Sequence, residues 1–216
     1  MERFRELIAN MPVREQAFTS KRKTWEKYTP ELTGIDNLIV ELFGNNESIE
    51  ISRHDLFTLA ECSKIKQFVF ATVVWGYPAG MRGRHFQSLF QRIYRIEQNL
   101  ISCRGKNIEN WNEHYKLVAA IEGLGLSTYT KFLYFLKVTI DNLPTLILDQ
   151  RLIEVFRKGI FPEFRDLKTI RYGNAPDLYP RYLRMMDSIA NKYRVNPGKL
   201  EMFLFEFGAN LKLIRV

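Results

Sequence analysis

The residues whose types and spacing suggest chemistry in this sequence are Lys131 and Asp149, which lie 18 residues apart. Lys131 falls in the first turns of a predicted helix, where the positive helix end and apolar neighbours both favour the neutral, nucleophilic amine. Asp149 precedes QRLIEVF at an N-cap position, which favours its charged form. An amine nucleophile and a fixed carboxylate facing a cationic sugar are groups that glycoside cleavage uses. The simpler alternatives are a lysine extended along its helix surface and an aspartate that only caps.

A glycine turn precedes the lysine helix. Gly123 and Gly125 close this turn, and Ser127 or Thr128 is predicted to cap the helix that follows. Such a turn points backbone N–H groups outward, and the helix adds its positive end, so a phosphate oxygen fits there. The alternative is an ordinary connection between two helices.

A second loop, WGYPAGMRGRH at residues 75–85, combines aromatic and basic side chains. Tyr77, Arg82 and Arg84 on such a loop suit a surface that meets phosphates and unstacked bases. The alternative is a connector whose Trp75 belongs to the core.

The remaining pattern predicts a mainly α fold. Helices are predicted at residues 17–28, 65–74, 86–101, 111–122, 182–193 and 198–207, with an extended connector at 142–148 and an irregular stretch at 158–180. Ser52 with Asp55, and Asn196 before Pro197, are predicted helix starts. Residues 1–50 are interpreted as an N-terminal helical arm that packs on a main domain at residues 51–216.

Composition narrows the function classes. Lys and Arg number 32 against 24 Asp and Glu, and a net charge of +8 favours an anionic partner, nucleic acid first. A basic protein without such a partner is the alternative. The two cysteines, Cys62 and Cys103, match no zinc pattern and cannot hold an iron–sulfur cluster, so no metal or cofactor is predicted. Without a bilayer-spanning apolar run or a secretory segment, we expect a cytoplasmic protein with reduced thiols.

The order of these features resembles the helix-hairpin-helix DNA glycosylase superfamily: a glycine turn, a lysine in the next helix, an extended linker and an aspartate at the following cap. TKFLYFL followed by PTLILDQRL is most similar to bacterial proteins with an 8-oxoguanine DNA glycosylase (OGG) fold. The similarity is specific over residues 112–156, weaker in the WGYPAG loop and the C-terminal region, and absent over the first 50 residues. Residues 126–130 separate the second glycine from Lys131, whereas in better-known members the lysine follows almost at once.

The resemblance implies a bifunctional glycosylase and AP lyase that flips an oxidised purine, first 8-oxoguanine, out of duplex DNA. Lys131 would form the Schiff base and Asp149 would be the catalytic aspartate. The implied contacts with DNA and with the flipped base are Gly123, Gly125, Ser127 and Thr128 for the phosphate grip, Tyr77, Arg82 and Arg84 for the vacated gap or the opposite strand, and Phe203 and Phe207 for the base pocket. We expect a monomer associated with a bacterial nucleoid.

Four other interpretations stay open from the sequence. One is a binding module that keeps this fold without the chemistry, although a pure binder needs neither the lysine nor the aspartate. Another is a glycosylase for a different modified base. A third is a component of a bacterial antiphage defence system, and the last is an α-helical protein that does not bind nucleic acid.

Overall fold

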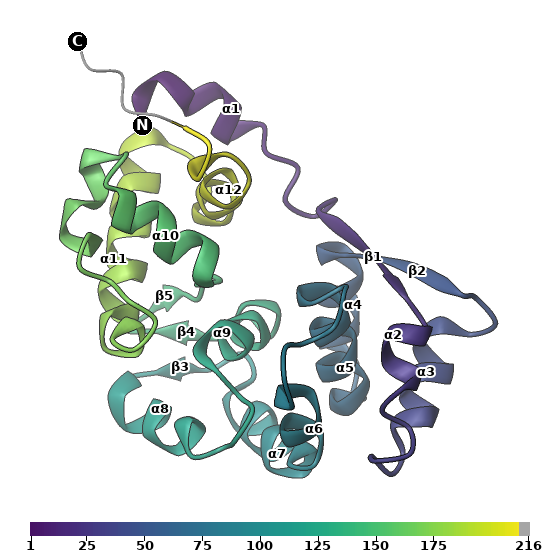
Figure 1. The fold of residues 1–216 in the computed structure, drawn as a ribbon. Coiled ribbons are helices and arrows are strands. Elements are labelled where there is room, and N and C mark those ends of the chain that lie inside the picture. The colour runs from purple at the N-terminus through teal and green to yellow at the C-terminus, as the bar shows by residue number, and fades with distance from the viewer. Residues whose placement is uncertain (212–216) are drawn as a thin grey trace.

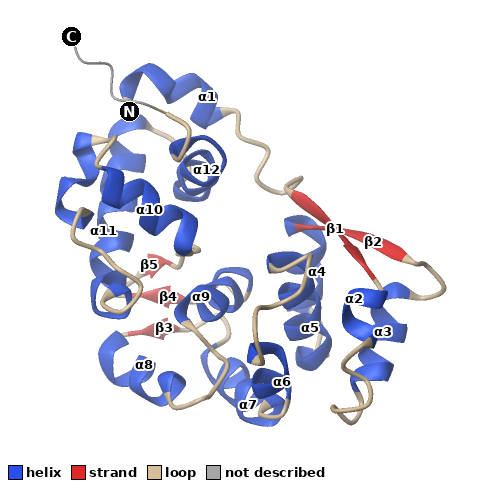
Figure 2. Cartoon of the chain, in the orientation of Figure 1, coloured by secondary structure: helices blue, strands red, loops and turns tan. Residues whose placement is uncertain are grey.

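The computed structural model describes residues 1–211, and over these residues the predicted mainly α fold is confirmed (Figure 1). The helices are η1 (Glu2–Phe4), α1 (Arg5–Ala9), α2 (Lys23–Glu26), α3 (Ile35–Phe43), α4 (Arg53–Glu61), α5 (Ile65–Gly76), α6 (His85–Phe90), α7 (Ile93–Cys103), α8 (Trp111–Ala119), α9 (Leu126–Phe135), α10 (Gln150–Lys158), η2 (Pro162–Leu167), α11 (Ala175–Tyr193), α12 (Pro197–Phe203) and η3 (Leu204–Gly208). The strands are β1 (Ala17–Lys21), β2 (Ser48–Ser52), β3 (Asn107–Ile108), β4 (Thr139–Ile140) and β5 (Leu143–Pro144). Figure 2 shows how little strand this fold contains.

Helix α5 is the central element on one side of the molecule, and it confirms the helix predicted at residues 65–74. It contacts α3, α4, α7, α9 and β1, and every side chain from Phe68 to Trp75 is buried. A helix surrounded by other elements needs apolar residues on all faces, which explains why its sequence lacks a polar stripe.

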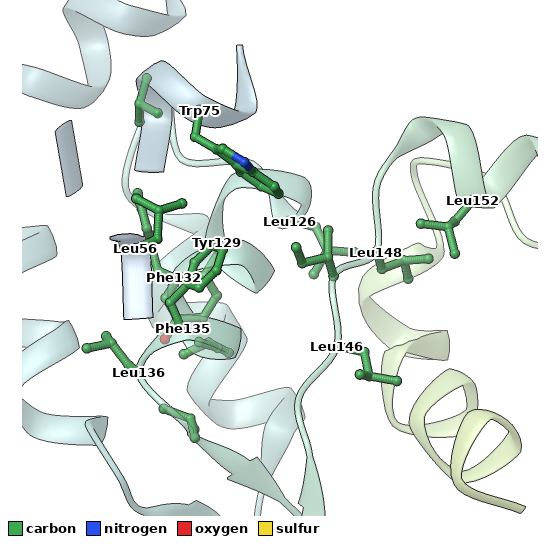
Figure 3. Close-up of a cluster of buried hydrophobic side chains, with 14 of the residues drawn as sticks. Leu56, Trp75, Leu126, Tyr129, Phe132, Phe135, Leu136, Leu146, Leu148 and Leu152 are labelled. Atoms are coloured by element: carbon green, nitrogen blue, oxygen red, sulfur yellow. The ribbon is translucent and has the colours of Figure 1, made fainter. Parts of the chain in front are cut away.

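Helix α9 lies between the α4–α5 pair and the connector that leads to α10 (Figure 3). Phe135 packs edge-on against Trp75 of α5, with ring centroids 5.5 Å apart. On its other side, α9 is hydrogen-bonded to the connector, because Thr130 Oγ1 accepts the N–H of Leu148 at 3.2 Å. The connector is extended as predicted, and β5 pairs with β4 at its start. These contacts on both sides of α9 fix the segment that carries Lys131 and Asp149.

The N-terminal region differs from the predicted helical arm. Residues 17–28 form β1 and the short α2 instead of one helix, and β1 pairs antiparallel with β2 from Ala17–Ser52 to Lys21–Ser48. A tertiary partner strand overrides the weak helical pattern here, since β2 supplies the hydrogen bonds that a helix would have made internally. The region also reaches both sides of the molecule: α1 contacts α12, and β1 contacts α5. The domain division at residue 50 stays a prediction, and it falls within β2.

Two other predicted helices have different limits. The helix expected at residues 86–101 is broken into α6 and α7 at Gln91 and Arg92. The helix expected from residue 182 starts at Ala175 and contains Pro180. Proline lacks the N–H that would bond the carbonyl of Pro176, and the indole of Trp111 donates to that carbonyl instead, at 2.8 Å. The proline is tolerated because a side chain from α8 replaces its missing hydrogen bond.

The C-terminal helix is also shorter than expected. It begins at Pro197 with Asn196 as its N-cap, as predicted, but α12 ends at Phe203 and continues as the π-helix η3. The Ser52–Asp55 pair forms the predicted capping box at the start of α4. None of the described helices is both long enough and apolar enough to cross a membrane.

Candidate active site

The side chains of Lys131 and Asp149 line the same cavity, which has a volume of about 190 Å³. Its walls come from four parts of the chain: β1, the α4–α5 pair, the α9–α10 segment and the C-terminal helices. The lining residues are Gln16, Phe18, Arg53, Trp75, Gly76, Pro78, Lys131, Ile147, Asp149, Glu201 and Phe205. The two predicted catalytic residues thus line one cavity, whose wall also contains charged and aromatic side chains.

Lys131 is almost completely buried, with 5% of its surface exposed, which excludes the surface-lysine alternative. Its Nζ donates to the carbonyl of Ser127 at 3.1 Å and to the hydroxyl of Ser127 at 2.9 Å. It lies 5.4 Å from the ring centroid of Tyr77. A Cβ placed on Gly76 would come within 3.0 Å of the Cδ and Cε of Lys131, so the glycine makes room for the lysine stem. These contacts hold the amine at the cavity wall.

Asp149 is the N-cap of α10, as predicted, and its Oδ1 accepts the N–H of Leu152 at 3.1 Å. The connector before it is held by α11: the hydroxyl of Tyr179 donates to the carbonyl of Leu146 at 2.6 Å, and that of Tyr182 to Ile147 at 2.9 Å. A carboxylate on a fixed backbone has little freedom to move away from the cavity. The capping role therefore holds the carboxylate at the wall of the cavity that Lys131 also lines.

A buried ion pair, which the sequence did not reveal, forms another wall of the cavity. Arg53 donates to Glu201 through Nη1 at 2.8 Å and Nη2 at 3.3 Å, and its Nε donates to Oε1 of Gln16 at 2.6 Å. Arg53 is 1% exposed and Glu201 is fully buried. The two parallel N–H···O bonds are the geometry of an ionised arginine–carboxylate pair. The only hint in the sequence is a lone glutamate within the apolar stretch LEMFLF.

In this ion pair, burial and the attraction between the two charges shift each pKa in opposite directions. Burial raises the pKa of Glu201, and the guanidinium of Arg53 counteracts that rise. Burial acts to lower the pKa of Arg53, but Glu201 and Tyr134 together outweigh it, so the pKa of Arg53 is raised. A buried pair of this kind adds little net stability compared with apolar residues of similar size.

The aromatic residues of the cavity are not the two that the resemblance implied. Phe203 is completely buried against Phe4, with ring centroids 5.2 Å apart, and Phe207 is 41% exposed. Neither lines the cavity, whereas Phe205 and Trp75 do. The π-helix η3 begins just after Phe203 and changes which side chains face inward, and the sequence did not predict this change of period.

The glycine turn before α9 is confirmed as a turn, but the predicted capping is wrong. Gly123 has φ +85°, and a Cβ there would lie 2.6 Å from the backbone N of Leu89, so this glycine is needed for packing on α6. The N-cap of α9 is Gly125, without a side-chain cap. Ser127 lies inside the helix and holds Lys131.

The two sequence motifs around the cavity are joined by one hydrogen bond. Thr128 Oγ1 and the hydroxyl of Tyr77 lie 2.8 Å apart, which ties the first turn of α9 to the loop after α5. Arg82 and Arg84 of that loop are exposed, and Arg84 approaches Glu31 at 4.0 Å. Within residues 1–211, no cluster of three or more histidine, cysteine, aspartate or glutamate side chains could hold a metal ion.

Comparison with known proteins identifies a family for this chain. A family model described as "Putative 8-oxoguanine DNA glycosylase OGG-like protein" matches residues 11–205, which include all of the residues that line the cavity. The expectation that similarity is absent over the first 50 residues is therefore wrong, because the match includes residues 11–50. No curated protein and no solved structure gives a significant match.

Proposed function

This chain belongs to the family described as "Putative 8-oxoguanine DNA glycosylase OGG-like protein", and on that premise we propose that it is a DNA glycosylase with AP-lyase activity. The observation that carries the proposal is the convergence of Lys131 and Asp149 on one cavity, with the lysine amine buried and hydrogen-bonded. A protein that only bound DNA would need neither side chain there.

The proposed reaction starts with a nucleotide flipped from the duplex into the cavity. The neutral amine of Lys131 attacks C1′ of the sugar, the bond from C1′ to the base nitrogen breaks, and the base leaves with the bonding electrons and takes up a proton. The C1′–O4′ bond then opens, O4′ is protonated, and a protonated imine joins Nζ to C1′. The carboxylate of Asp149 stabilises the positive charge that develops on the sugar.

The lyase step follows from the imine. Loss of a proton from C2′ expels the 3′ phosphate, so the strand is cut by β-elimination, and water later releases the lysine by hydrolysing the imine. The phosphates on either side would be held by the α8–α9 turn and by the loop after α5, where Arg82 and Arg84 are exposed. We propose that the protein acts on duplex DNA as a monomer.

An oxidised guanine is the proposed base. The cavity wall offers the carboxylate of Glu201 and the amide of Gln16 for hydrogen bonds, and Phe205 and Trp75 for stacking. Carboxylate oxygens only accept hydrogen bonds, and guanine-type bases present two adjacent donors on their Watson–Crick edge, N1–H and the exocyclic amino group, whereas adenine-type bases present the acceptor N1 beside their one exocyclic amino group. Arg53 balances the charge of Glu201, so this wall suits an uncharged base.

Borohydride trapping tests the proposal. The protein is mixed with duplexes that contain 8-oxoguanine opposite cytosine, an abasic site or undamaged guanine. We expect a covalent adduct with the first two duplexes, because the imine forms after base excision or directly on the abasic sugar. The Lys131→Gln variant should give no adduct while its affinity for duplex DNA stays nearly unchanged.

Lys137→Gln is the matched control, since Lys137 follows the same helix but is exposed and paired with Glu61 at 2.8 Å. It should trap like the wild type. An adduct with the abasic duplex alone would support the AP-lyase activity and indicate that the protein excises a base other than 8-oxoguanine. Undiminished trapping by Lys131→Gln would reject the assignment, and DNA binding without any adduct would support a binding module.

A further inference from the structure

The N-terminal segment from Ser20 to Lys27 braces the loop that follows α5. The hydroxyl of Ser20 donates to the carbonyl of Pro78 at 2.8 Å and accepts the indole N–H of Trp25 at 2.9 Å. Pro78 itself lines the cavity. The segment therefore lies next to the cavity wall, although its sequence is far from both Lys131 and Asp149.

This segment places two lysines on one helical face. Lys23 and Lys27 are four residues apart on and just after α2, and both are exposed. A Cβ on Gly80 would lie 3.9 Å from the Nζ of Lys27, so this face borders the loop that carries Arg82. We name the three cations Lys23, Lys27 and Arg82 the α2 basic surface.

The acidic residue of α2 does not neutralise this surface. Glu26 pairs with Arg22 at 2.7 Å. Within residues 1–211, no carboxylate lies within 4.0 Å of the charged nitrogens of Lys23, Lys27 or Arg82. Exposed cations without carboxylate partners repel one another, and a polyanion would relieve that repulsion.

The geometry around the cavity relates this surface to the α8–α9 turn. Tyr77 is hydrogen-bonded to Thr128 beside that turn, and three residues later Gly80 lies beside Lys27. The loop from Tyr77 to Gly80 thus runs from the turn to the α2 basic surface and passes the cavity at Pro78. Duplex DNA carries one phosphate charge per about 1.7 Å of its axis, so a duplex that delivers a nucleotide to the cavity brings phosphates to both sides of it.

We propose that the α2 basic surface binds backbone phosphates of the duplex on the side of the cavity opposite the α8–α9 turn. This inference rests on the proposed function for the nature of the ligand. It assigns a part in holding DNA to the N-terminal region, which the family model includes from residue 11. Lys23 and Lys27 position the duplex and take no part in the chemistry.

The test is the salt dependence of binding to a duplex that contains an abasic site. Each phosphate contact contributes about 0.9 to the slope of log affinity against log salt concentration. We expect the double variant Lys23→Ala/Lys27→Ala to reduce the slope by about 1.8, since two contacts are lost. Its borohydride trapping at saturating protein concentration should equal that of the wild type, because Lys131 is untouched.

Lys64→Ala/Lys192→Ala is the control, since it removes the same charge from sites at the far end of α5 and on α11. Lys23→Arg/Lys27→Arg should retain the wild-type slope. The inference is overturned if Lys23→Ala/Lys27→Ala and the control Lys64→Ala/Lys192→Ala have the same salt slope. It is also overturned if the wild type fails to bind duplex DNA at low salt. A wild type that binds DNA but traps nothing would reject the proposed chemistry, while the slopes would still decide the role of this surface.

Discussion

Two polar clusters line one cavity, and they differ in how the chain builds them. The lysine cluster, Ser127 with Lys131 and Asp149, comes from α9, the connector and the start of α10, which follow one another in the sequence. The ion-pair cluster joins Gln16, Arg53 and Glu201, and its two charged partners are 148 residues apart. We infer that the local cluster carries the chemistry and that the long-range cluster recognises the base.

The two clusters also differ in how they are stabilised. The lysine cluster relies on hydrogen bonds within a single helical turn and on a helix cap, so the local conformation of each part is set by residues close in the sequence. The ion-pair cluster is completely buried, and each charge depends on the other for compensation. Removing one charge should therefore be far more damaging in the second cluster than in the first.

The largest expected effect is on the ion pair. Arg53→Met leaves the carboxylate of Glu201 buried without a partner, and we expect the free energy of unfolding to fall by about 3–5 kcal/mol. The double variant Arg53→Met/Glu201→Leu should recover most of that loss, because two apolar side chains replace the pair. Denaturant unfolding of the wild type and both variants measures these differences.

The same double variant separates recognition from chemistry. It should excise 8-oxoguanine poorly and still cleave an abasic duplex, since an abasic sugar presents no base to recognise. Normal excision by the folded double variant would contradict the recognition role of the ion pair. Equal loss of excision and abasic cleavage would indicate that the two clusters act as one unit.

The second expected effect concerns the carboxylate of Asp149. The Asp149→Asn variant keeps the cap of α10, because asparagine and aspartate are similar N-cap residues. This substitution should therefore leave the unfolding free energy nearly unchanged but slow base excision by about 10²–10³-fold, since the charge that stabilises the cationic sugar is gone. Single-turnover excision kinetics and thermal unfolding test the two halves of this prediction.

Asp149→Ala provides the comparison, because it loses the cap as well and should cost about 1 kcal/mol of stability. An asparagine variant that excises at the wild-type rate would reduce Asp149 to a structural cap.

The smallest effect on the free energy of unfolding is expected at the capping box of Ser52 and Asp55. This capping box sets the start of α4, where Arg53 is the first residue. The side chain of Ser52 donates a hydrogen bond that lowers the pKa of Asp55. The contribution of Asp55 is thus present above the ordinary aspartate pKa and is lost as pH falls through the lowered value. Asp55→Ala should reduce the unfolding free energy by less than about 1 kcal/mol at neutral pH, because Asp55 is exposed and solvent screens its charge, and the difference from the wild type should shrink in acid. Denaturant unfolding at several pH values checks the sign.

Local patterns in the sequence predicted the lysine cluster because its parts are encoded close together. The glycine turn and the cap at Asp149 each follow from short-range rules, and the described structure confirms both. The structure adds that Lys131 is buried. The predicted caps at Ser127 and Thr128 were wrong, because both residues lie within the first turn of α9 and bond to Lys131 and Tyr77 instead.

Tertiary structure alone decided the rest of the cavity. No short-range rule links Gln16 or Arg53 to Glu201, and a single glutamate among apolar residues does not identify its partner. The pairing of β1 with β2 likewise overrides the helix expected at residues 17–28. The sequence by itself thus determined the helical fold class and the placement of the lysine cluster, since both depend on neighbours along the chain. Only the folded chain decided which buried charges and aromatic rings face that cluster, because burial and ion pairing depend on contacts between distant segments.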